Sequence, residues 1–207
     1  MKYLKNLLIL CFVIATGSSL GRAQESRCPL PLSHARAVRV PAELAKEVLR
    51  QAFTWMETPA DEQKGIIQQA EKTKEGISGL FCAQAIQVSR VGKPGLFIYG
   101  AEVGFSSYCN AQNCLVWIYR PETSGYELLL EDVMVAEYEP EYNNIVVLRT
   151  STNSYRDIKL TQHISAAETG IRILKFDGRR YRARACMMET DVKGKKPRLT
   201  KMKCDSR

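Results

Sequence analysis

Histidine is scarce in this chain, and long apolar runs are absent after the first 23 residues. His34 and His163 are the two histidines among 207 residues, so imidazole ligands and general bases are few. No stretch after the N-terminal segment approaches the roughly 20 apolar residues that a membrane-spanning helix needs. We therefore expect a chain that does not span a membrane, with little support for histidine or metal chemistry.

Motifs that carry specific chemistry are also missing. No Gly-x-Ser-x-Gly nucleophile elbow accompanies His163 and the nearby Asp157, so a catalytic triad is poorly supported. No Asp-x-Asp-x-Asp-Gly loop favours Ca²⁺, and the Cys109-x4-Cys114 spacing differs from that of a structural zinc site. We expect a non-enzymatic protein with no cofactor and no metal site, and the sequence alone assigns no activity.

The first 23 residues have the pattern of a cleaved secretory signal. Lys2 and Lys5 precede the apolar run Leu7–Ala15, and small residues follow up to Ala23. We expect cleavage there and export of residues 24–207, as a single domain, to the periplasm or the exterior of a bacterial cell. Loss of the segment removes three basic residues and lowers the net charge from +8 to +5.

Six of the seven cysteines follow this segment. In an oxidising compartment, an even number of thiols predicts up to three disulfides rather than a metal site. A small ring formed by Cys109 and Cys114 is the most direct pairing. Cys28 with Cys82, and Cys186 with Cys204, complete one of the many pairings that six cysteines allow, and the spacing does not choose among them.

Residues 41–74 have the periodicity of two helices. Pro41, with an acidic residue two positions later, is a typical helix start, and apolar residues at helical spacing follow up to Met56. Thr58-Pro59 ends this helix, and a more polar one is expected from about Ala60 to Lys74. The apolar face of the helices needs a partner surface that buries it.

Residues 80–186 are rich in β-branched and aromatic residues, with turn signals at short intervals. The strongest turn signal is Asp177-Gly178. Strands are expected at 83–90, 95–100, 115–120, 126–132, 144–149, 156–164 and 170–176. This pattern predicts an α+β domain in which two helices pack on a mainly antiparallel sheet of about seven strands. The basic tail, 187–207, is expected to be loosely held unless Cys204 fixes it.

Charge is unevenly distributed along the chain. Residues 122–142 contain seven acidic residues and no basic one, whereas residues 172–207 contain 13 basic residues against four acidic ones. The C-terminal part could bind an anionic surface, although solvated faces and a tail often hold such charges. The net charge is too small to indicate a nucleic-acid partner, so we expect an unknown protein or an envelope component instead.

Aromatic residues are the candidate binding residues. Trp117 and Tyr119 alternate along a predicted strand, and Phe105 and Tyr108 lie in the loop before it. Alternating aromatic residues can form a platform for a sugar or a peptide. They can equally be cross-strand pairs that fill one face of a sheet.

Part of the chain resembles known β-repeats. The segment 92–100, Gly-Lys-Pro-Gly followed by an apolar strand, resembles the strand of FG-GAP or VCBS-type repeats. The segments 109–120, 125–130, 152–158 and 176–181 look like a pattern found in uncharacterised secreted bacterial proteins. The resemblance covers about residues 80–186 and implies a β-rich extracytoplasmic fold without a known catalytic activity. It implies no calcium site, because the positions that need acids hold Ser89, Arg90, Val91 and Gly95.

Three functions are compatible with these features. The first is a non-enzymatic binding or interaction protein of the cell envelope. The second is an inhibitor of an extracellular hydrolase, in which the acidic segment 122–142 docks on a basic enzyme. The third, with the least support, is an envelope hydrolase that uses His163.

Overall fold

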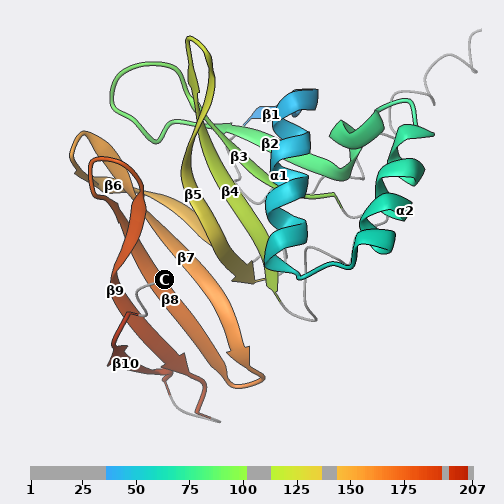
Figure 1. Cartoon of the computed structure of the whole chain (residues 1–207). Coiled ribbons are helices and arrows are strands. Elements are labelled where there is room, and N and C mark those ends of the chain that lie inside the picture. Colours follow the sequence, from blue (N-terminus) through green and yellow to red (C-terminus); the bar gives the residue numbers. More distant parts are fainter. Residues whose placement is uncertain (1–35, 102–112, 137–143, 193–195, 205–207) are drawn as a thin grey trace, which may run out of the picture.

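Three layers are stacked in the computed structural model, which describes residues 36–101, 113–136, 144–192 and 196–204 (Figure 1). Two helices form the first layer, a five-stranded sheet the second, and another five-stranded sheet the third. One apolar core lies between the helices and the first sheet, and a second core lies between the two sheets. The α+β class predicted from the sequence is confirmed.

The helical layer follows the predicted pattern closely. Helix α1 spans Ala42–Trp55 and helix α2 spans Ala60–Glu71, each beginning directly after a proline. A 3-10 helix, η2, spans Gly76–Leu80 and leads into the first sheet. The buried face of α1 consists of Leu44, Ala45, Val48, Leu49, Ala52 and Phe53. Helix α2 is more exposed and buries Ala70, which agrees with its polar composition.

The first sheet contains the strands in the order β1-β2-β3-β4-β5, all antiparallel. Their bounds are Arg36–Val38 (β1), Phe81–Ile86 (β2), Gly95–Gly100 (β3), Asn113–Glu122 (β4) and Gly125–Ala136 (β5). The second sheet is an antiparallel meander in the order β10-β9-β8-β7-β6. Its strands span Ile145–Thr152 (β6), Tyr155–Ser165 (β7), Glu168–Phe176 (β8), Tyr181–Thr190 (β9) and Arg198–Met202 (β10).

The sequence predicted a single sheet of about seven strands, whereas the chain forms two sheets of five strands each. The second sheet is explained by the burial of the first sheet, which is the middle layer of the molecule. Phe97, Ile98 and Tyr99 are consecutive residues of β3, so their side chains point to opposite faces, yet all three are fully buried. Ile98 packs in the core below the helices, while Phe97 and Tyr99 pack in the core between the sheets. A sheet buried on both faces needs a cover on each side.

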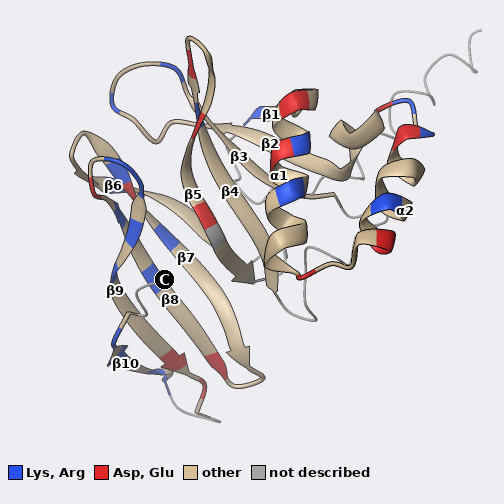
Figure 2. Cartoon of the chain, viewed as in Figure 1, with Lys and Arg blue, Asp and Glu red and all other residues tan. Residues whose placement is uncertain are grey.

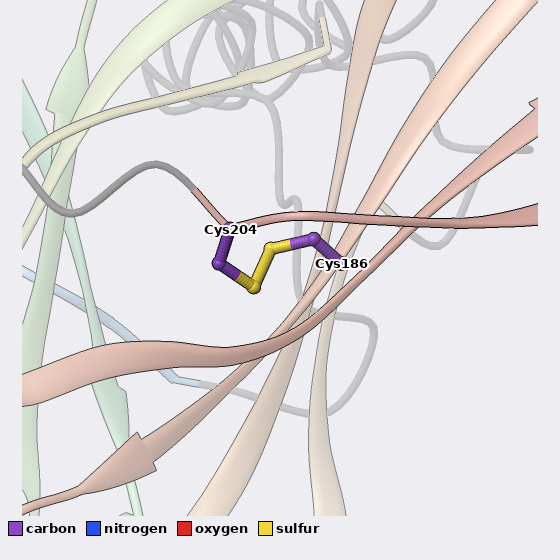
Figure 3. Close-up of a disulfide and its surroundings, with 2 residues drawn as sticks. All are labelled: Cys186 and Cys204. Carbon is purple, nitrogen blue, oxygen red and sulfur yellow. A yellow bond between two sulfur atoms is a disulfide. The ribbon is translucent and has the colours of Figure 1, made fainter.

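The C-terminal segment is more ordered than its composition indicates. Strand β9 continues to Thr190, and β10 pairs with it in register from Arg198 to Met202. The Cys186–Cys204 disulfide joins the two strands near the end of β10 (Figure 3). Cys204 thus fixes the tail, which is the exception anticipated from the sequence.

Candidate functional site

Of the two possibilities left open for Trp117 and Tyr119, a binding platform or a filled sheet face, the burial of both side chains agrees with the second. Trp117 and Tyr119 are 1% and 2% exposed, and both belong to the core between the helices and the first sheet. Trp117 packs edge-on against Phe81, with the ring centroids 6.1 Å apart. Burial raises the pKa of the Tyr119 hydroxyl. The two residues therefore fill a sheet face, while Phe105 and Tyr108 lie outside the described residues.

The cysteine prediction is confirmed where the structure describes both partners. Cys186 and Cys204 form a disulfide. Cys82 and Cys114 each take part in a disulfide whose partner is not among the described residues. Cys28 and Cys109 lie outside the described residues, so their pairings with Cys82 and Cys114 stay predictions.

His163 is not placed for catalysis with Asp157. The two residues lie six positions apart along β7, and an extended strand spans about 20 Å over that length. The side chain of His163 is exposed, whereas its main chain forms two hydrogen bonds with the side chain of Asn113 in β4. The Asn113 amide donates to the His163 carbonyl at 2.9 Å, and the His163 N–H donates to Asn113 Oδ1 at 2.8 Å. These two hydrogen bonds join the first sheet to the second.

Within the described ranges, no group of three or more His, Cys, Asp or Glu side chains is arranged to hold a metal ion. Among the helices of the same ranges, none is long and apolar enough to cross a membrane.

A shallow groove of about 510 Å³ lies at one end of the second sheet, where the β6–β7 and β8–β9 hairpins turn. Both hairpins reach the same side of the molecule in Figure 1. The lining residues are Thr152, Asn153, Lys175, Phe176, Asp177, Arg184 and Ala185. The volume falls within the range of small-molecule sites. The groove combines two cationic side chains with polar turn residues and the apolar side chains of Phe176 and Ala185.

The turn of the β6–β7 hairpin connects the two halves of the groove. Asn153 and Ser154 both have positive φ, at 50° and 67°, which gives the tight two-residue turn that a twisted hairpin favours. The amide of Asn153 donates to the carbonyl of Phe176 at 2.9 Å, so this turn is fixed to the end of β8. The groove is therefore built from two hairpins that this hydrogen bond joins.

A buried carboxylate lies under the groove. Asp157 is 2% exposed and accepts a 2.8 Å hydrogen bond from the hydroxyl of Thr152. The ammonium group of Lys175 lies 4.0 Å from its other oxygen. Since a buried charge needs partners, Asp157 holds two groove residues, Thr152 and Lys175, in place.

The β8–β9 turn presents further cations. The N–H groups of Arg179 and Arg180 donate to Asp177 Oδ1, and these hydrogen bonds hold the pKa of the Asp177 carboxyl below its ordinary value. The guanidinium of Arg182 lies 3.6 Å from the same carboxylate. Asp177 thus organises a turn whose neighbouring side chains are arginines.

Basic residues concentrate in the second sheet. The described residues 144–192 and 196–204 contain 13 basic and five acidic residues, a net charge of +8. The described residues 36–101 and 113–136 contain ten basic and 11 acidic residues, a net charge of −1. Figure 2 shows Lys and Arg along the hairpin end of the second sheet. Those on the two hairpins and their strands are Arg149, Arg156, Lys159, Arg172, Lys175, Arg179, Arg180, Arg182 and Arg184. Charge is thus separated between the layers.

None of the groove residues was predicted from the sequence to bind a ligand, although one signal indicated this region. The excess of basic residues after position 172 indicated a cationic C-terminal half. It did not indicate that the β6–β7 turn would meet this half, because that contact depends on the pairing of β7 with β8.

No protein-family model, curated protein or solved structure matches the chain. The class that the structure itself defines is an α+β domain with a helical layer, a buried middle sheet and a cationic outer sheet. The resemblance of residues 80–186 to FG-GAP or VCBS-type repeats stays a prediction.

Proposed function

We propose that this chain is an exported, non-enzymatic protein that binds an anionic component of the cell envelope through its second sheet. The observation that carries the proposal is the separation of charge between the layers, +8 on the second sheet against −1 on the remainder of the described chain. A surface of one sign attracts partners of the opposite sign and accelerates their association. The N-terminal signal pattern supports export, and the disulfides agree with an oxidising compartment.

The inhibitor hypothesis has less support because three of the seven acidic side chains in its segment form ion pairs within the chain. Of the acidic residues in segment 122–142, Glu122 and Glu127 form ion pairs with Arg120, and Glu131 forms one with Arg180. The last of these pairs joins the first sheet to the β8–β9 turn. These carboxylates stabilise the hairpin and the contact between the sheets, so they offer less charge to a basic enzyme. The remaining hypothesis, a hydrolase that uses His163, loses its orienting acid.

Vesicle binding tests the proposal. The purified protein is sedimented with vesicles of phosphatidylglycerol and phosphatidylcholine, and with vesicles of phosphatidylcholine alone, at low and high salt. We expect retention on the anionic vesicles at about 0.1 M salt and release at about 1 M, where screening shortens the range of electrostatic attraction from about 10 Å to about 3 Å. Equal binding to both vesicle types, or none to either, contradicts the proposal.

A parallel pull-down tests the inhibitor alternative. Lysozyme and common proteases are immobilised, and the protein is applied at low and high salt. Salt-sensitive retention on a basic hydrolase, lost when Glu122 and Glu127 are replaced by glutamine, would favour the inhibitor over the envelope-binding protein. No retention is the result we expect.

A further inference from the structure

We propose that the groove between the β6–β7 and β8–β9 hairpins is a binding site for a phosphate group, with Lys175 and Arg184 as the residues that hold it. The inference rests on the proposed function and assigns it a place and a ligand chemistry. The phosphate group could be carried by a soluble phosphate monoester or by the head group of an anionic lipid. Both sources present a negatively charged phosphate whose oxygens accept hydrogen bonds.

The first argument is the arrangement of cations on adjacent strands. Lys175 of β8 is directly opposite Arg182 of β9 in the ladder, and Arg184 follows two positions later. Residues directly opposite in an antiparallel pair share a face, and like charges in this position destabilise the sheet. Asp157 lies near Lys175 and Asp177 lies near Arg182, whereas Arg184 has no ion-pair partner among the described residues, so a bound anion gives a physical reason for this third cation.

A β-bulge gives the second argument. The ladder between β8 and β9 shifts at Ile173/Leu174, where the pairs change from Ile173–Ala185 to Leu174–Ala183 and leave Arg184 as the extra residue. A bulge redirects the side chain of the inserted residue and interrupts the alternation of faces. As a result, Arg184 and its neighbour Ala185 both line the groove.

The third argument is that neither Lys175 nor Arg184 is held by a short ionic contact. Within the described part of the chain, the Arg184 side chain forms no ion pair and no hydrogen bond, and it is exposed. The ammonium of Lys175 is only loosely engaged, 4.0 Å from Asp157. Both groups can therefore bind an incoming anion without first breaking a short contact.

Phosphate fits this cluster better than a carboxylate does. An arginine presents several N–H donors that match phosphate oxygens, and a lysine adds a compact positive charge. Lys175, Arg184 and the neighbouring Arg182 carry three positive charges. Asp177 at the rim and the buried Asp157 carry two negative ones, so a net positive charge remains. The Asn153 turn, fixed to β8, leaves the groove open to solvent and accessible to a ligand on a larger molecule.

Variants with matched charge provide the test. The double variant Lys175→Ala/Arg184→Ala removes the two groove cations, and Lys201→Ala/Lys203→Ala removes two cations from β10 and the residue beyond it. The two variants have the same net charge. Binding of glycerol phosphate is measured by calorimetry, and binding to vesicles that contain phosphatidic acid is measured by sedimentation. We expect the groove variant to lose about tenfold or more in affinity, and the β10 variant to stay close to the unsubstituted protein.

The two probes distinguish the sources of the phosphate. Binding of glycerol phosphate with this difference between the variants supports a soluble ligand, and binding of the vesicles alone with the same difference supports a lipid head group. Equal losses in both variants overturn the groove site while leaving the proposed function intact. Absence of binding to every anionic probe, including the phosphatidylglycerol vesicles, overturns both.

Folding is monitored in the same variants. Since Lys175 is a partner of the buried Asp157 carboxylate, we expect the groove variant to have a lower urea midpoint than the unsubstituted protein. Arg184→Ala alone should keep the midpoint and still lose affinity, which separates binding from stability. A groove variant that is destabilised while Lys175→Arg/Arg184→Lys restores stability but not binding would assign the two residues a structural role and overturn the site.

Discussion

Trp117 shows how a residue that looks suited to recognition can belong to the core. It lies on the face of β4 that the helices cover, against the ring of Phe81, and its main chain pairs with Ile98 of β3. Large aromatic side chains bury much apolar area, and their value in a core is greater than at an exposed position.

Replacement of this residue should cost the protein much of its stability. We expect Trp117→Ala to lower the free energy of unfolding by about 3–5 kcal/mol, because it removes a fully buried side chain and leaves a cavity. The matched control is Trp55→Ala at the end of α1, where the side chain is 36% exposed and the expected loss is about 1 kcal/mol or less. Urea unfolding measures both, and equal losses would contradict the burial of Trp117.

Single residues also show what local chemistry could and could not indicate. The prolines before α1 and α2 and the Asp177-Gly178 turn were recognised from the sequence, because each sets local backbone geometry. The buried state of Asp157 was not, since a carboxylate in a strand is normally exposed. Its burial depends on Thr152 and Lys175, which approach it only once the strands are paired.

Strand β10 is the element most dependent on a covalent link. All five of its residues are exposed, and it pairs with β9 alone at the edge of the second sheet. Such a strand buries little apolar surface of its own. The Cys186–Cys204 disulfide closes a loop with a sequence separation of 18 and holds the strand against the sheet.

Removal of this disulfide should release β10 first. In the chain-entropy description, a loop of this size contributes about 3 kcal/mol. We expect the Cys186→Ser/Cys204→Ser variant to lose amide protection in residues 198–202 and keep it in β8. Hydrogen exchange followed by mass spectrometry measures the change. If β10 stays as protected as in the oxidised protein, the strand is held by packing alone.

The middle sheet couples the whole molecule. Its two faces belong to different cores, one shared with the helices and one shared with the second sheet. Arg120 adds a polar connection between the sheets, since its guanidinium reaches the hydroxyl of Tyr155. The three layers should therefore unfold together.

Two substitutions in different cores test this cooperativity. Leu49→Ala affects the helix–sheet core and Ile158→Ala the core between the sheets, and each should cost about 2–5 kcal/mol. We expect both to shift one common transition, with fluorescence and circular dichroism giving the same midpoint. Two separated transitions in either variant would show that the layers fold independently.

The sequence by itself determined two helices opened by prolines and, after them, the seven strands β2 to β8 in their order, but not β1, β9 or β10. Local backbone preferences and apolar periodicity are enough for this, because they act over a few neighbouring residues. The sequence also showed that basic residues are concentrated in the last part of the chain. The tertiary structure alone decided that the strands form two sheets, that Trp117 and Tyr119 are covered, and that Lys175, Arg182 and Arg184 meet beside the Asn153 turn. These outcomes depend on which strands pair and on what covers each face, and contacts between distant residues decide both.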